Sequence, residues 1–344
     1  MSVGIFLGIC LAGGLLYKYV AAPADNLAER RTFEAAAARL SGTYSSRSRG
    51  NFSAPFHRID CVLNGVSLVI DHARGERPSD VTFFTRVQAR ASELRSSDLS
   101  ISREDVVAHL DKIAGGQDVE LGDPAFDSRF LVKAEVPARA IAWLDAELRD
   151  VLVALDSWCV RVADGDLDLY RSGFVKDADE LVRAARATTL LAGAEDRWRR
   201  RWQQTAQALG ATTTTTGTTR FETFRAGMRM MVEPDLGGAR PRVCLRLELG
   251  RVVAERLEIA RAPGTSWPML PGWRVDSSPP AAAERWLRPE ACAALVTLDP
   301  LVVVMDGKSV RVDLPGAEHS VDALEQAMAL VALLASHHTA ALYR

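Results

Sequence analysis

The acidic segment Glu120–Phe130, ELGDPAFDSRF, contains the side chains best suited to chemistry in this sequence. Two converging carboxylates, here Asp123 and Asp127, can act as a general acid and base or bind a cation. The alternative is a turn, because Gly-Asp-Pro is typical of turns and the two phenylalanines would pack inside. The corresponding segment of the second half of the chain, Trp267–Trp273, keeps an aromatic end and lacks both aspartates. We therefore favour the turn.

Two further groups could contact a ligand. His337 and His338 are adjacent, so on a helix they point about 100° apart and do not share one metal-binding face. We interpret them as cations near a helix C-terminus. The arginines of 197–201, interleaved with Trp198 and Trp202, would contact anionic lipid or nucleic acid. The alternative, which we favour, is an exposed helix face with extended arginines.

The usual signatures of catalysis and cofactor binding are missing from the sequence. It contains no GxxxxGK[ST], GxGxxG after a strand, HExxH, GxSxG or paired CxxC motif. Its cysteines are odd in number and isolated, which indicates small core residues rather than a disulfide framework or zinc site. We predict no catalytic, cofactor-binding or metal-binding residue. The net charge of −2 argues against a nucleic-acid partner bound by overall electrostatics.

The N-terminal segment is apolar. Residues 3–17 carry no charge, and the apolar run continues after Lys18 to Ala22. We predict a transmembrane helix that anchors the chain in the lipid bilayer through residues 3–22. The basic residues that follow the run place the globular body in the cytoplasm, at a bacterial inner membrane, by the positive-inside rule. The alternative is a signal peptide cleaved near Ala22-Pro23-Ala24, which would make the body periplasmic or secreted.

The small residues Gly4, Gly8 and Ala12 recur at four-residue spacing within this segment. Such a face allows two membrane helices to pack closely, so self-association through the anchor is one interpretation. The other, which we favour, is a membrane helix that merely tolerates glycine. A protein partner of the body is the remaining possibility.

The rest of the chain resembles itself. A shift of 143 residues aligns Phe130–Asp156 with Trp273–Asp299 without a gap, and 11 positions are then identical, including Trp143 over Trp286. Chance would give about two or three identities in a window of this length and composition. The pattern predicts two diverged copies of one unit.

Comparing the copies predicts their elements. Pro289 in the second copy indicates that a helix ends near Trp286 and another begins, so the first copy should also kink, at Trp143-Leu144. Asp164-Gly165 and Asp306-Gly307 each predict a hairpin whose two central residues have positive φ. Closing helices should begin near Ala178 and Ser320. The first should run on through 197–207 as one long connecting helix.

These elements predict an α+β fold. It is a tandem duplication of a unit with a mainly antiparallel sheet, a kinked helix pair and a closing helix, preceded by an N-terminal transmembrane helix. The predicted domains are a membrane anchor at 1–24, a first repeat unit at 25–193 and a second at 194–344.

The order GD-x-x-FD-x-x-F, Trp-Leu kinked helix pair, short hairpin and closing helix resembles that of bacterial proteins of unknown function with one N-terminal membrane segment. The resemblance covers most of the chain and implies a class without a known activity. We therefore predict a membrane-anchored binding or scaffold protein. The alternatives are an enzyme of unfamiliar type, with a site between the units or at Asp123 and Asp127, and a secreted or periplasmic protein.

Overall fold

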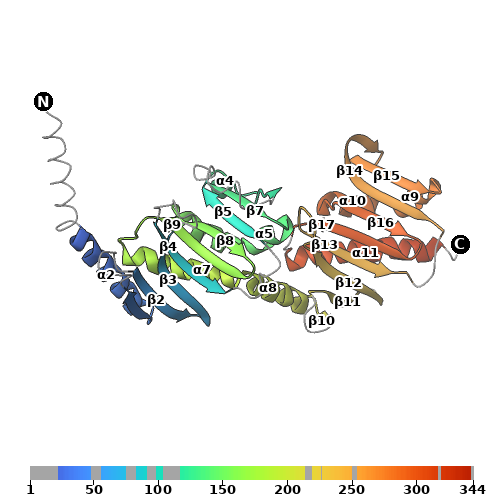
Figure 1. The fold of residues 1–344 in the computed structure, drawn as a ribbon. Helices are drawn as coiled ribbons and strands as arrows, with labels where there is room; N and C mark the ends of the chain where they lie inside the picture. The colour runs from blue at the N-terminus through green and yellow to red at the C-terminus, as the bar shows by residue number, and fades with distance from the viewer. Residues whose placement is uncertain are drawn as a thin grey trace, which may run out of the picture. The chain divides into compact units, whose positions relative to one another are not determined.

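The structure is a computed structural model that describes residues 22–47, 56–74, 83–90, 98–103, 117–213, 219–225, 227–249, 254–316 and 319–341. Its contacts divide the chain into two compact units, residues 1–135 with 144–195 and residues 136–143 with 196–344. Figure 1 labels their elements. Each unit is considered separately below.

The first unit contains a sheet of nine strands among the described residues, in the order β1-β2-β3-β4-β9-β8-β5-β7-β6. Each neighbouring pair is antiparallel. The strands are β1 (Thr43–Arg47), β2 (Phe56–Leu63), β3 (Val66–Arg74), β4 (Phe83–Arg90), β5 (Leu99–Arg103), β6 (Gln117–Asp118), β7 (Phe130–Ala134), β8 (Cys159–Ala163) and β9 (Asp166–Ser172).

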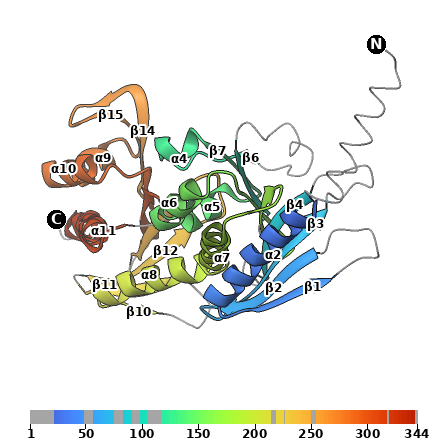
Figure 2. The same ribbon diagram turned by 90° about the vertical axis from the view of Figure 1, so that its left-hand side faces the viewer.

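Helices cover one face of this sheet. Helix α2 (Ala22–Arg39) packs on β2, and α7 (Ala178–Ala192) packs on β3, β4 and β9, as Figure 2 shows. The short α4 (Pro124–Asp127) precedes β7, and α6 (Ala146–Ala154) packs against α7. Helix α5 (Pro137–Trp143) is grouped with the second unit by its contacts.

The second unit has an eight-stranded sheet in its described part, in the order β10-β11-β12-β13-β17-β16-β14-β15, again with antiparallel neighbours. Its strands are β10 (Thr212–Thr213), β11 (Phe221–Arg225), β12 (Met228–Asp235), β13 (Arg242–Glu248), β14 (Arg256–Trp267), β15 (Leu270–Ser278), β16 (Val302–Asp306) and β17 (Ser309–Pro315). Its helices are α8 (Ala194–Ala208), α9 (Ala281–Trp286), α10 (Pro289–Leu298) and α11 (Val321–Ala341).

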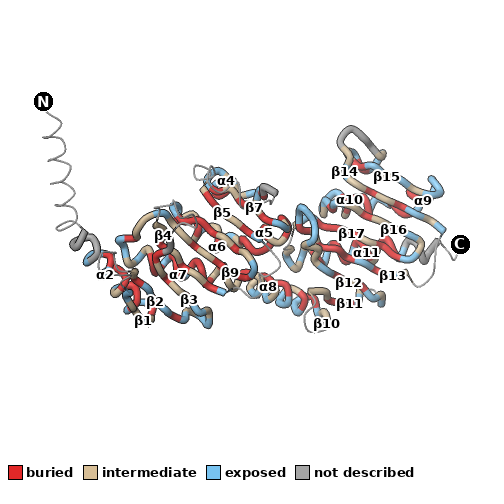
Figure 3. The backbone as a smooth tube through the Cα atoms, viewed as in Figure 1, coloured by how far each residue is buried: buried red, intermediate tan, exposed pale blue. Residues whose placement is uncertain are grey.

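The core of the second unit lies between this sheet and its helices. Alternate residues of each strand point to one face, and the buried set includes Val243, Leu245 and Leu247 of β13. Helix α11 packs on β13 and β17, and α9 and α10 pack against α11. The buried segments of Figure 3 follow this layer. The other face of β12, β13 and β17 carries the polar residues.

Both predicted kinked helix pairs are present. α5 ends at Trp143 and α6 begins after Asp145, whose side chain accepts a hydrogen bond from the Leu148 backbone N–H (3.0 Å). α9 ends at Trp286, and α10 begins with Pro289 as its first residue. Proline lacks an N–H that the first turn of a helix does not use, so Pro289 fits there.

The two hairpins differ in a way that was not predicted. Asp164 and Gly165 both have positive φ, 53° and 82°, as expected for the first hairpin. In the second hairpin Asp306 is paired with Ser309, so the turn moves one residue to Gly307-Lys308. The cause is the Asp306 carboxylate, which accepts hydrogen bonds from the backbone N–H groups of Lys308 (3.1 Å) and Ser309 (2.8 Å).

The fold-class prediction of an N-terminal transmembrane helix is corrected. Residues 1–21, which hold most of the predicted anchor, lie outside the described part, and no helix within that part is long and apolar enough to cross a membrane. Helix α2, which begins at Ala22, carries six charged residues in 18, too many for such a span. The observed class is two large antiparallel sheets with helices.

The long connecting helix is also corrected. The chain forms two helices, α7 and α8, that meet at Gly193. The Gly193 N–H donates to the carbonyl oxygens of Thr189 and Leu191 and so closes the end of α7. Glycine is the residue that most often ends a helix.

Candidate binding site on the second sheet

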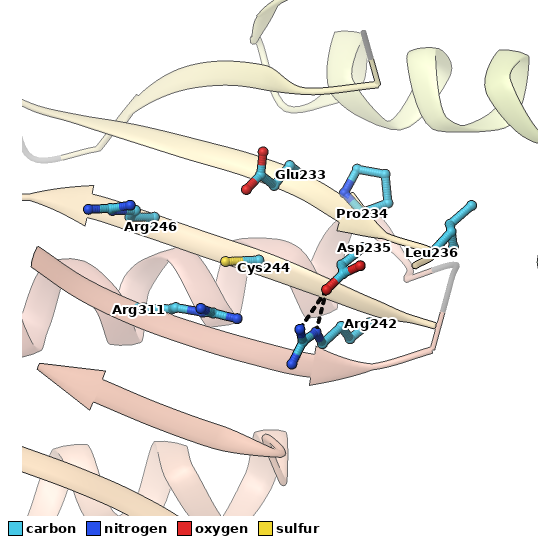
Figure 4. A pocket seen from close by; sticks show the side chains of 8 residues that line it. All are labelled: Glu233, Pro234, Asp235, Leu236, Arg242, Cys244, Arg246 and Arg311. Atoms are coloured by element: carbon cyan, nitrogen blue, oxygen red, sulfur yellow. Dashed lines mark hydrogen bonds and ion pairs between the residues drawn. The ribbon is translucent and has the colours of Figure 1, made fainter. Parts of the chain in front are cut away.

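A depression of about 410 Å³ lies on the polar face of the second sheet, over three adjacent strands (Figure 4). Strands β12, β13 and β17 supply its lining, together with the start of the β12–β13 turn. The lining residues are Glu233, Pro234, Asp235, Leu236, Arg242, Cys244, Arg246 and Arg311. The strands alternate, so residues two apart on β13, such as Arg242, Cys244 and Arg246, all point to this face.

Asp313 of β17 lies beside the lining residues and organises the arginines around it. Its side chain is 0% exposed. The Arg311 guanidinium donates from Nε to Oδ1 and from Nη2 to Oδ2, both at 2.7 Å. Arg242 adds a longer hydrogen bond from Nη1 to Oδ2 at 3.4 Å. Two positive charges therefore neutralise one buried carboxylate, and the hydrogen bond to Asp313 raises the pKa of Arg311.

The end of the depression near the β12–β13 turn is closed by a second ion pair. Arg242 donates from Nε and Nη2 to Asp235 Oδ2 at 2.8 and 2.6 Å. The Gly237 backbone N–H donates to Asp235 Oδ1 at 3.0 Å. The hydrogen bond from Gly237, and then that from Arg242, lower the pKa of Asp235, so it stays ionised at neutral pH.

Cys244 lies in the middle of the depression, opposite Glu233 on one side and Asp313 on the other. Burial, followed by the charge of Asp313, raises the pKa of its thiol to about 12. The thiolate is the nucleophilic form of cysteine, so this thiol is unreactive near neutral pH.

Arg246 and Glu233 are lining charges that make no ion pair among the described residues. Arg246 is exposed and directly opposite Arg311 on the neighbouring strand. Among the described residues it makes no hydrogen bond or ion pair. Like charges directly opposite each other on antiparallel strands are destabilising. Here Asp313 binds Arg311, and Arg246 interacts electrostatically with Asp306.

The equivalent face of the first sheet is paired differently. There Gln88 of β4 and Asp168 of β9 are opposite each other, and Gln88 Nε2 donates to Asp168 Oδ1 at 2.8 Å. Arg86, also of β4, forms a bidentate ion pair with Asp71 of the next strand, β3. Its Nε and Nη2 each donate to one carboxylate oxygen of Asp71 at 3.1 Å. The two-arginine arrangement is thus a feature of the second sheet.

The structure places the predicted acidic pair in a turn. The Asp123 carboxylate caps α4 by accepting from the backbone N–H groups of Ala125 and Phe126, and accepts from Arg149 Nε at 2.9 Å. The Asp127 carboxylate accepts from the N–H groups of Leu121, Gly122 and Asp123 at 3.0–3.1 Å. Both carboxylates are bound to their own loop, while Phe126 and Phe130 stack at a centroid distance of 4.8 Å.

We expect Asp127→Ala to destabilise the first unit by about 2 kcal/mol, because three backbone N–H groups lose a charged acceptor. Urea unfolding of the variant and the wild type measures this difference. Glu120→Ala is the matched control, because Glu120 is an exposed carboxylate in the same segment. Equal stability of the two variants would contradict the structural role of Asp127.

The other groups singled out from the sequence lie on helices. His337 and His338 belong to α11, and their side chains lie outside the described part of the structure. Trp198 and Trp202 of α8 are buried, so these aromatic rings are not available for stacking with a nucleic-acid base. No group of three or more potential metal ligands was found among the described residues. The cysteines Cys61, Cys159, Cys244 and Cys292 are free and buried.

The sequence did not point to the depression. The alternation of apolar and charged residues in Arg242–Glu248 was a signal for one polar face. No such signal exists for the pairing of β13 with β17, because 60 or more residues separate these strands. Only the sheet order brings Arg246 opposite Arg311.

Comparisons with known proteins identify no family for this chain. No family model matches the chain, and no curated protein matches it. Among solved structures, the mycobacterial trehalose monomycolate transport factor A, TtfA, is similar at 12% identity and a TM-score of 0.33, over 40% of this chain and 93% of that one. At these values the likeness carries no argument about function.

Proposed function

We propose that this chain is a binding protein that receives its ligand in the depression on the polar face of the second sheet. The observation that carries the proposal is the set of three arginines from β13 and β17, one of which, Arg246, makes no hydrogen bond or ion pair among the described residues. In small-molecule sites a few convergent polar groups fix the orientation of the ligand.

Binding is favoured over catalysis by the state of the titratable groups. The thiol of Cys244 has a pKa of about 12 and is protonated at neutral pH. The carboxylate of Asp235 is held in its charged form, and efficient acid–base catalysis needs a pKa near the working pH. The enzyme alternative at Asp123 and Asp127 is not favoured, because both carboxylates are used by their own turn.

The scaffold part of the prediction remains in the proposal. If β6 is left out and the strands of each unit are numbered from that unit's first strand, the two sheets have the same strand order. We propose that the chain is a tandem duplication in which one copy kept a self-paired sheet face and the other acquired a ligand site. The predicted location of the body stays a prediction.

An NMR experiment on the isotope-labelled full chain tests this proposal. A set of small anionic, cationic and neutral compounds is added one at a time. We expect the binders to shift the amide signals of β12, β13 and β17, and to remain chemically unchanged in the sample. Binders that shift only signals elsewhere, or that are converted to product, would overturn it.

A further inference from the structure

Strand β15 forms an open edge of the second sheet. It is the last strand in the order of that sheet, and among the described residues it pairs with β14 alone (Figure 1). An open edge presents backbone N–H and C=O groups that can pair with another strand. We propose that the β15 edges of two copies of this chain pair antiparallel, with Val275 opposite Val275, and form a symmetric dimer.

The first unit shows that such an edge accepts a further strand. The strand with the same place in its sheet is β7, and the shift of 143 residues aligns Val132 of β7 with Val275 of β15. β6 covers the outer edge of β7, and just beyond it the Val119 N–H donates to the Val132 carbonyl oxygen at 2.9 Å. The backbone groups of Val275 therefore face the open edge of β15.

Two charged residues make the β15 edge complementary to itself. Arg274 and Asp276 flank Val275, and their side chains are 54% and 63% exposed. When Val275 lies opposite Val275 of the second copy, Arg274 of each copy lies opposite Asp276 of the other. Opposite charges directly across an antiparallel pair are stabilising. The dimer thus gains two cross-strand ion pairs around its two-fold axis.

The existing partner of these charges does not prevent the exchange. Within one chain Arg274 Nε donates to Asp276 Oδ2 at 2.8 Å, and Arg274 also lies 3.9 Å from Glu258 of β14. Exposed ion pairs of this kind contribute less than about 1 kcal/mol in water. Pairing across the dimer replaces the contact between neighbours on one strand with a contact between strands, and leaves Glu258 beside Arg274.

The same charges exclude the neighbouring registers. Opposite residues of an antiparallel pair lie on the same face of the sheet, so a symmetric pair of strands is centred on a residue and not between two. The next registers are centred on Arg274 or on Asp276. Each of them places two like charges directly opposite each other, which is destabilising. The charge pattern therefore selects the register centred on Val275.

Pairing also covers apolar surface on the other face of the sheet. Trp273 is buried, and the half-buried Val275 packs against the core of the second unit. A two-fold axis perpendicular to the sheet keeps the helix-covered faces of both copies on one side, so the two Val275 side chains pack together. An unrelated peptide would match the backbone of β15 without matching its charges, and this difference favours a second copy as the partner.

Sedimentation velocity of the full chain over a concentration series tests the proposed dimer. We expect a monomer–dimer equilibrium for the wild type, and affinity at least about tenfold lower for Arg274→Asp, which sets two carboxylates against two others. Adding Asp276→Arg to this variant exchanges the charges and should restore the dimer. Arg229→Asp is the matched control, because Arg229 is a 61% exposed, paired arginine of β12 and lies away from the edge.

Cysteine cross-linking tests the register itself. Chains with Arg274→Cys are mixed with chains with Asp276→Cys and mildly oxidised. The two cysteines lie opposite each other only in the register centred on Val275, where opposite residues are within the range of a disulfide. We expect more disulfide-linked dimer in the mixture than in either variant alone. This measurement stays decisive if Arg274→Asp does not fold.

Three results would overturn the proposed dimer. The first is a wild type that stays monomeric at its highest soluble concentration. The second is a dimer that Arg274→Asp weakens no more than Arg229→Asp does, which indicates association through another surface such as the predicted anchor. The third is no excess of cross-linked dimer in the cysteine mixture. Because β15 does not line the depression, none of these results bears on the proposed function.

Discussion

Replacing Asp313 by alanine is expected to destabilise the second unit by about 3 kcal/mol. The carboxylate is fully buried and accepts from two arginines, and removing one partner of such a group leaves the opposite charges uncompensated. The effect lies at the low end for buried ion pairs, because the side chains of Arg311 and Arg242 are 39% and 40% exposed and keep access to water. Urea unfolding measures the loss.

The matched control for Asp313→Ala is Asp276→Ala. Asp276 lies on β15 of the same sheet and pairs with Arg274 at 2.8 Å, but its side chain is 63% exposed. Exposed ion pairs contribute less than about 1 kcal/mol. A similar loss in both variants would show that Asp313 does not organise the arginines as described.

Acidification is expected to destabilise the first unit by about 3 kcal/mol between pH 6.5 and pH 4. His57 of β2 and His72 of β3 are 2% and 6% exposed, and pack beside Phe33 of α2. Burial, and then the charge of His57, lower the pKa of His72 to about 4 from its ordinary value of 6.5. Burial, and then Arg30, also lower the pKa of His57, against the opposing effect of Glu34.

The sign follows from proton linkage. Between these two pH values the unfolded chain binds a proton at His72 and the folded chain does not, so the free energy of unfolding falls as the pH falls. Each pKa unit corresponds to about 1.4 kcal/mol, and below about pH 4 the loss from this group levels off. His57 contributes in the same direction.

Hydrogen exchange of the amides of β2 and β3 measures this loss at pH 7, 5.5 and 4.5. The variant His72→Phe removes the titrating group and keeps an aromatic ring beside Phe33 and Phe174. We expect a weaker pH dependence in the variant than in the wild type. An identical dependence in both would show that His72 does not govern acid stability.

Local signals predicted much of the element order. Proline disrupts the interior of a helix, so Pro289 predicted the break between α9 and α10 from covalent geometry. The match of Trp286 with Trp143 extended this prediction to the first unit. The hairpin turn predicted at Asp164-Gly165 is confirmed, because both residues adopt positive φ. The turn predicted at Asp306-Gly307 was wrong, because the Asp306 carboxylate accepts hydrogen bonds from the backbone N–H groups of the turn. Sequence spacing does not show whether the side-chain hydrogen bonds or the positive φ of the Asp-Gly pair will decide the turn position.

The candidate site lay beyond such signals. Its charges belong to strands far apart in the chain, and their partnership depends on β17 being inserted between β13 and β16. The sequence instead drew attention to Asp123 and Asp127, whose spacing serves hydrogen bonds within one turn. A motif search finds residues close in sequence, whereas this site is assembled by sheet order.

A crystal of the full chain soaked with tungstate tests the central claim most directly. Tungstate is a tetrahedral oxyanion whose anomalous scattering locates it without ambiguity. The account predicts an anomalous peak in the depression, within hydrogen-bond distance of a guanidinium group of Arg242, Arg246 or Arg311, and no such peak at Gln88 and Asp168. Peaks elsewhere on the chain with none in the depression would contradict it.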